Sequence, residues 1–232
     1  MNKKNYLLDL NNSKKPFIIY KSDKGFDLYT DFSKKIILNN NNIEKFINKN
    51  NRLKLPYKET DLFIGFFGYE ILNNLIDVKI KKQKTINFPK GIFYKPETKI
   101  KLPNNLEYKK TRSLNSNDLF KININKKSYK VIFDKFKKKI KSGETYQIKI
   151  CTKYSNKSEI DALDFFSRLV KSNMAPEAFM IKDKNYSIIS CSPENLITKK
   201  NNFITTKPIA GTLKKTKKLN KNKALTFFRK NL

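Results

Sequence analysis

The stretch from Ser192 to Thr212 holds residue types that could carry chemistry. Glu194 follows Pro193, which restricts the backbone beside the carboxyl, and the order Pro-Ile-Ala-Gly-Thr follows at 208–212. A glutamate held neutral can donate a proton. Glycine lets a backbone approach a ligand closely, and threonine offers an N–H and a hydroxyl to an anion. We therefore predict a proton donor and an anion-binding turn on one small sheet.

Each of these residues also has a plain structural interpretation. Glu194 could pair with one of the many lysines, and Gly211-Thr212 could form an ordinary turn. The sequence has no histidine, which excludes Ser–His and Cys–His nucleophilic catalysis by its own residues. Cys151 and Cys191 are far apart and outside any Cys-x-x-Cys pair, so we expect both to be reduced core residues on strands.

The chain is strongly basic, with 51 Lys+Arg against 20 Asp+Glu in 232 residues and a formal charge of +31. Such a charge raises nucleic acid or an anionic membrane as a partner. Base recognition and bidentate phosphate binding depend on arginine, however, and nearly all of these residues are lysine. The arginines are Arg52, Arg112, Arg168 and Arg229. We therefore expect neither nucleic acid nor a membrane as partner, and charge-driven nucleic-acid binding stays open as an alternative.

Two observations bear on location. The longest apolar run, 62–69, is much shorter than the roughly 20 residues of a membrane helix. The N-terminal lysines lead only to Tyr6-Leu7-Leu8 before Asp9 interrupts, so we expect no secretory leader. A cytoplasmic protein is the expectation.

The elements that must position these residues fall into two regions, 1–124 and 125–232, divided within a polar segment at 98–125. The first region should consist of strands and loops, and the glycines of the apolar passage 61–70 should permit close backbone packing. Its expected elements are strands at 17–20 and 35–38 and a helical turn at 43–47.

The second region shows sharper patterns. Ser128 should cap a helix whose apolar positions recur up to Ile140, and Gly143 should end it. Further expected elements are a strand at 145–151, a helix opened by Ser158-x-x-Asp161, an antiparallel meander at 178–182, 186–190 and 196–205, and a helix at 220–232. The sequence thus predicts an α+β fold.

From Ser128 onward the order helix, Gly-Glu-Thr-Tyr-Gln, helix, Asn-x-Ala-Pro, Ser-Pro-Glu, Pro-Ile-Ala-Gly-Thr resembles the chorismate-utilising enzymes. These include the large subunits of anthranilate synthase and aminodeoxychorismate synthase, and the isochorismate and salicylate synthases. Upstream, the passage 64–70 resembles a Gly-Tyr-x-x-Tyr-Asp/Glu passage of the amine-forming members. The resemblance implies antiparallel sheets flanked by helices, a β-sandwich around the chorismate site. It makes 1–124 the N-terminal region and 125–232 the start of the chorismate-binding catalytic domain.

The resemblance also implies roles for single residues. Glu194 falls where the family has its general acid, and Gly211 and Thr212, with Ala210 beside them, fall where it binds a substrate carboxylate. Gln147 occupies a position that is a water-activating lysine in the water-using members. Because a neutral amide cannot act as a base at pH 7, Gln147 favours ammonia as the nucleophile, supplied by a glutamine amidotransferase subunit. The alternative, that Gln147 is a strand residue without a role, stays open.

Two features of the sequence favour different products of the reaction. In the best-known aminodeoxychorismate synthases a lysine nucleophile stands at the position of Ala210, which here is alanine as in anthranilate synthases. Lys21 and the passage 173–178, however, depart from the feedback-site motifs of tryptophan-inhibited anthranilate synthases. We favour aminodeoxychorismate synthase component I of the folate branch. Anthranilate synthase component I of the tryptophan branch is the alternative.

Complete members continue past the helix near Asn220 into a segment with magnesium-binding glutamates, a histidine and an arginine. We therefore expect this chain to be the truncated N-terminal portion of such an enzyme, incomplete at its C-terminus and inactive by itself. It should hold no metal ligand, and the Mg²⁺ ligands should lie in the C-terminal half. A non-catalytic binding subunit, or half of a split enzyme, is the alternative of a different class.

Overall fold

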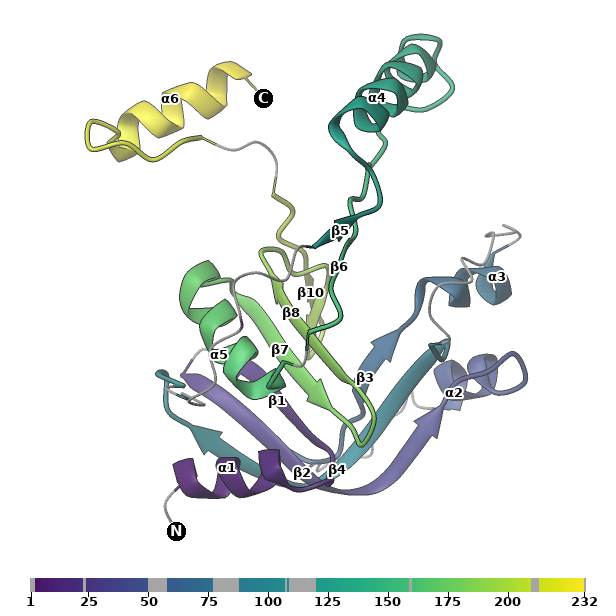
Figure 1. Cartoon of the computed structure of the whole chain (residues 1–232), viewed down its shortest axis with the longest axis vertical. Helices are drawn as coiled ribbons and strands as arrows, with labels where there is room; N and C mark the ends of the chain where they lie inside the picture. Colours follow the sequence, from purple (N-terminus) through teal and green to yellow (C-terminus); the bar gives the residue numbers. More distant parts are fainter. Residues whose placement is uncertain are drawn as a thin grey trace. The chain divides into compact units, whose positions relative to one another are not determined.

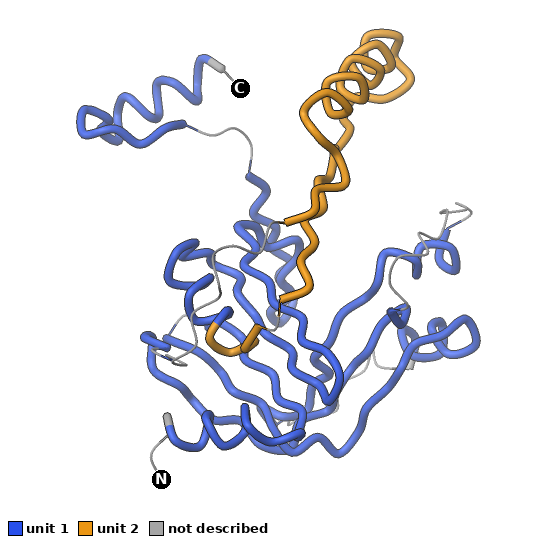
Figure 2. Tube along the Cα trace, in the orientation of Figure 1, with its two compact units in different colours: residues 1–108, 165–232 blue, residues 109–164 orange. Residues whose placement is uncertain are grey.

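A computed structural model describes residues 3–22, 24–49, 58–76, 88–106, 108, 120–158, 160–209 and 213–231. Helices are combined with antiparallel strands, which confirms the α+β class (Figure 1). The chain divides into two compact units, Met1–Tyr108 with Phe165–Leu232, and Lys109–Asp164 (Figure 2). The expected boundary at 124/125 separates regions of family resemblance and stays a prediction.

The first unit is built on a six-stranded sheet in the order β3-β4-β2-β1-β7-β8, with antiparallel neighbours. The strands are β1 Phe17–Ser22, β2 Gly25–Ile37, β3 Ile64–Phe67, β4 Gly91–Leu102, β7 Glu177–Lys182 and β8 Ser187–Ser192. Strand β1 pairs with β7, so one sheet takes strands from both sides of residue 124.

Strand β4 extends into the polar segment at 98–125, in which the sequence predicts a boundary. The strand continues to Leu102. In this part of β4, Ile100 is opposite Leu28 and Leu102 is opposite Phe26 of β2. Pairing with a long neighbouring strand therefore outweighs the low strand propensity of the polar residues.

Both faces of the sheet are packed. On one face Ile18, Tyr29, Ile92, Tyr94 and Ile181 form a buried cluster. The intervening side chains of β1 and β7 point to the opposite face, where Phe17, Ile19, Ala178 and Met180 are fully buried. Phe166 of helix α5 (Ala162–Asn173) packs edge-on against Phe26 of β2 with ring centroids 6.1 Å apart. Side chains of the central strands therefore form the core of the first unit on both faces of the sheet.

The remaining elements of the first unit are short. They are α1 Lys3–Asn12, α2 Ile43–Lys49, η1 Tyr69–Ile71, α3 Leu72–Leu75, the hairpin of β9 Thr198–Lys200 with β10 Phe203–Thr205, and α6 Lys221–Asn231. The helices expected near residue 43 and residue 220 are confirmed.

At the start of α5, Asp161 rather than Ser158 accepts from a first-turn amide, with Asp164 N at 2.9 Å from its Oδ1.

The second unit confirms the amphipathic helix and corrects its cap. Helix α4 spans Lys126–Lys141, and its N-cap is Asn125, whose Oδ1 accepts from Ser128 N at 2.8 Å. Ser128, expected as the cap, therefore lies within the first turn. Gly143 ends the helix with a φ of +78°, and the next amide, of Glu144, donates to Lys139 O at 3.0 Å.

The strand expected at 145–151 is wrong. These residues form neither helix nor strand, and Tyr146 is 91% exposed. An alternating pattern forms a strand only when a neighbouring strand supplies the ladder, and no described residue pairs with this segment. The two-stranded pair of this unit is instead β5 Lys121–Ile122 with β6 Tyr154–Ser155. Cys151 is exposed, contrary to expectation, whereas Cys191 lies partly buried on β8; both are free thiols.

A polar network closes the turn between β7 and β8. Asp183 is buried and accepts hydrogen bonds from Lys35 Nζ, Tyr94 Oη and Tyr186 Oη, while Lys184 N donates to its Oδ1 at 2.7 Å. Burial by itself raises the pKa of Asp183, but these donors outweigh burial and lower the pKa from 3.8 to about 2. Burial also raises the pKa of Tyr186 to about 12.

Replacing Asp183 should destabilise the protein in a pH-dependent way. Because the folded-state pKa is below the ordinary value, the contribution of the carboxylate is present above pH 3.8 and is lost as the pH falls through about 2. We expect Asp183→Asn to lower the free energy of unfolding by about 1–3 kcal/mol at pH 7. The difference from wild type should shrink between pH 4 and pH 2, measured by urea unfolding. Asp134→Asn, which replaces an exposed carboxylate, is the control. A loss of unfolding free energy in Asp183→Asn that does not change with pH would contradict the lowered pKa of Asp183.

Candidate active site

The predicted proton donor lies just beyond the sheet. Strand β8 ends at Ser192, and Glu194 belongs to a segment, 193–197, without regular structure that leads into β9. The hairpin of β9 and β10 then reverses the chain at Asn201, whose φ is +54°. As a result Ile209 N donates to Glu194 Oε1 at 3.1 Å. The structure therefore brings Glu194 beside Ile209, the second residue of the Pro-Ile-Ala-Gly-Thr sequence.

The predicted anion-binding residues, Ala210, Gly211 and Thr212, lie outside the described residues, and their role stays a prediction. The contact of Glu194 reaches the residue immediately before them. Glu194 itself is exposed. A carboxyl that donates a proton near neutral pH needs desolvation or a neighbouring negative charge, so a bound ligand must cover this side chain if it acts as an acid.

Gln147 belongs to the second unit. It is exposed and lies in the irregular segment that replaces the expected strand, and its carbonyl accepts from Thr145 Oγ1 at 3.2 Å. Gln147 belongs to the second unit, whereas Glu194 belongs to the first. The role of Gln147 therefore stays a prediction from resemblance.

Lys21 and the passage 173–178, which were compared with the feedback-site motifs, lie close together because β1 pairs with β7. Lys21 Nζ donates to the carbonyl of Ala175 at 2.6 Å. Tyr20 Oη donates to Glu177, and Asn195 Nδ2 donates to the same carboxylate at 3.0 Å. Sequence reasoning did not single out Glu177 or Asn195. The available signals for Glu177 were its place in the passage 173–178 and its charge directly before the apolar residues 178–181.

The apolar passage 64–70 forms β3 and η1. A Cβ on Gly65 would lie 1.9 Å from Ile92 O of the paired strand β4. This confirms that Gly65 permits a close approach of two backbones.

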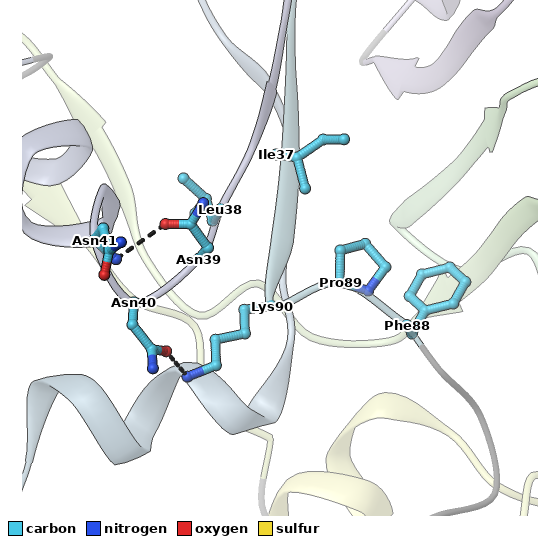
Figure 3. Close-up of a pocket in the computed structure, with 8 residues that line it drawn as sticks. All are labelled: Ile37, Leu38, Asn39, Asn40, Asn41, Phe88, Pro89 and Lys90. Carbon is cyan, nitrogen blue, oxygen red and sulfur yellow. Dashed lines mark hydrogen bonds between the residues drawn. The ribbon is translucent and has the colours of Figure 1, made fainter.

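A surface pocket of about 580 Å³ lies elsewhere in the first unit (Figure 3). Its lining residues are Ile37, Leu38, Asn39, Asn40, Asn41, Phe88, Pro89 and Lys90. Lys90 Nζ donates to Asn40 Oδ1 and, at 2.6 Å, to Asn74 Oδ1. The pocket contains none of the predicted site residues.

The described residues contain no group of three or more His, Cys, Asp or Glu side chains that could hold a metal ion. None of their helices combines the length and apolar character needed to cross a bilayer.

Comparison with known proteins gives a consistent family. A family model described as chorismate binding enzyme matches residues 3–229. The chain is 23% identical over 188 residues to an anthranilate synthase component I-like protein of Synechocystis, covering 70% of this chain and 39% of that protein. It is 36% identical over 72 residues to aminodeoxychorismate synthase component 1 of Salmonella typhimurium, covering 31% and 16%. It is 32% identical over 118 residues to anthranilate synthase component 1 of Buchnera aphidicola, covering 50% and 22%.

The chain thus spans well under half the length of the curated relatives it matches. Both kinds of aminating synthase occur among them. Because the family match runs over nearly all of the sequence, the chain belongs to the chorismate binding enzyme family.

Proposed function

We propose that this chain supplies part of the active site of an enzyme that aminates chorismate. In this reaction ammonia adds to the chorismate ring and the C4 hydroxyl leaves as water. The observation that supports the proposal is the hydrogen bond from Ile209 N to Glu194 Oε1, which brings an acid beside Ile209 in a member of this family.

Glu194 is the proposed general acid for the departing hydroxyl. Hydroxide is a poor leaving group, so proton donation to the C4 oxygen lowers the barrier. Chorismate carries two carboxylates, and their negative charge beside Glu194, together with exclusion of water, favours the protonated carboxyl. Gly211 and Thr212, beside Ala210, are proposed to bind one substrate carboxylate through backbone N–H groups and the threonine hydroxyl.

Gln147 is proposed to face the incoming nucleophile. As a neutral amide it can orient ammonia by hydrogen bonding but cannot deprotonate water at pH 7. Ammonia would come from a glutamine amidotransferase subunit, which component I relatives imply in general.

For the product we favour 4-amino-4-deoxychorismate, on the folate branch. Lys21 supports this assignment, because its ammonium group is held on the Ala175 carbonyl and this pairing departs from the motifs of tryptophan-inhibited enzymes. Ala210 favours the second candidate, anthranilate, because an alanine at this position cannot form a covalent intermediate. The tryptophan branch is therefore the alternative.

The rest of the site is proposed to come from sequence that corresponds to the remainder of the relatives, continued in the same polypeptide or supplied by a second chain. This follows from the 39% or smaller share of the relatives that the chain covers. Mg²⁺ is proposed as the cofactor from the family resemblance, with its ligands in that remainder. We call this chain together with that remainder the completed enzyme.

Incubation with chorismate, ammonium and Mg²⁺ tests the proposal, with products separated by chromatography. We expect the 232-residue chain by itself to leave chorismate unchanged and the completed enzyme to convert it to an aminated product. Fluorescent anthranilate would select the tryptophan branch. Robust turnover by the chain alone would show that its own residues form a whole site and would overturn the proposed division.

A further inference from the structure

We propose that Glu177 is a positioning residue that holds the Glu194 segment against the sheet by joining Tyr20 to Asn195. The proposal rests on the proposed function of Glu194 as the acid. It concerns residues of the first unit alone, and the two hydrogen bonds of Glu177 carry it.

The register of the sheet places these residues together. Tyr20 of β1 is opposite Phe179 of β7, so both side chains point to the same face. Glu177 is the next-but-one neighbour of Phe179 and shares that face. Ser192, the last residue of β8, is opposite Glu177. Glu177 therefore lies at the corner of the sheet where the Glu194 segment begins.

The carboxylate of Glu177 uses both oxygens. Oε2 accepts from Tyr20 Oη, and Oε1 accepts from Asn195 Nδ2 at 3.0 Å. The amide oxygen of Asn195 in turn accepts from Thr198 Oγ1 at 3.1 Å, at the first residue of β9. Hydrogen bonds to an ionised acceptor are stronger than those between neutral groups. Asn195 is thus fixed from the sheet and from the following hairpin.

This arrangement acts on Glu194 through the chain. Residues 193–197 form no strand, so side-chain contacts must fix their conformation. Asn195 follows Glu194 directly, and a shift of Asn195 displaces the neighbouring carboxyl from Ile209 N. Because a displacement of about 1 Å can cost roughly 100-fold in rate, a fixed Asn195 matters for an acid on a segment without regular structure.

The test uses Glu177→Gln, with Asn195→Ala as an independent break of the same contact. Glu97→Gln is the matched control, because Glu97 is an exposed glutamate on β4 of the same sheet. Glutamine keeps the size of the side chain but removes its negative charge, so both contacts lose the ionised acceptor that strengthens them. The first readout is hydrogen exchange of the Ile209 amide in the 232-residue chain.

We expect exchange at Ile209 to become roughly three- to tenfold faster in Glu177→Gln and in Asn195→Ala. Amides of β7 that pair with β1 should keep their protection, which shows that the sheet is intact. The control should match wild type. An unchanged Ile209 rate in both variants, with the sheet intact, overturns the proposal.

The second readout is the steady-state kinetics of the completed enzyme that carries the same substitutions. We expect kcat to fall about 10- to 100-fold with KM for chorismate changed less than about threefold, because the acid acts on the leaving group in the transition state. The double variant should lose no more than either single variant. Faster exchange with unchanged kcat overturns the positioning role. A wild-type completed enzyme without aminating activity overturns the proposed function instead, and leaves the exchange result standing.

Discussion

Replacing Glu194 by glutamine is expected to lower the turnover of the completed enzyme by at least about 100-fold. The amide cannot protonate the C4 hydroxyl, so the leaving group departs without assistance. Glutamine keeps the oxygen that accepts from Ile209 N, so the segment should retain its position. Chorismate binding should therefore change little, and kcat should fall far more than KM rises.

The measurement is steady-state kinetics with ammonium as the amino donor, which bypasses the amidotransferase. Glu97→Gln is again the control for a lost surface charge on the same sheet. Glu194→Asp should recover part of the activity, because the shorter side chain keeps the carboxyl but shifts it. Turnover of Glu194→Gln within about threefold of wild type would exclude Glu194 as the acid.

The largest expected effect on stability is at Gly65. A Cβ at this position would lie 1.9 Å from Ile92 O and 2.8 Å from Phe93 Cα, and both are backbone atoms. Neither can move without separating β3 from β4, where Gly65 is opposite Phe93. We expect Gly65→Ala to lower the free energy of unfolding by about 3 kcal/mol.

Urea and thermal unfolding measure this loss. Gly68→Ala is the matched control, because the nearest atom to its Cβ would be Lys90 O at 3.1 Å, which would need to move by only a few tenths of an ångström. Its cost should be about 1 kcal/mol or less. Equal destabilisation by the two variants would contradict the close approach of β3 and β4 at Gly65.

Local signals predicted local structure well. The apolar repeat and Gly143 predicted helix α4 and its end, because helix hydrogen bonds and caps join neighbours in sequence, and Gly143 adopts the positive φ that such an end needs. The strand expected at 145–151 failed because a strand depends on a partner elsewhere in the chain. The same dependence gave β4 its unexpected length up to Leu102, since β2 supplies the pairing.

The site shows the same division. Glu194 and Ile209 lie on either side of the hairpin of β9 and β10, so a local reversal of the chain brings them together. Tyr20 and Glu177 are 157 residues apart and meet only because β1 pairs with β7. No spacing in the sequence indicates that contact, and Glu177 enters the comparison with the family only as part of the passage 173–178.

The most direct test of the central claim is the aminating activity of the completed enzyme with chorismate, ammonium and Mg²⁺. The aminodeoxychorismate synthase component 1 of Salmonella typhimurium serves as the reference under the same conditions. We predict one aminated product per chorismate consumed in the wild type, and at least about 100-fold less in Glu194→Gln. Chorismate returned unchanged by the wild-type completed enzyme, while the reference is active, would contradict the claim that this chain contributes to a chorismate-aminating site.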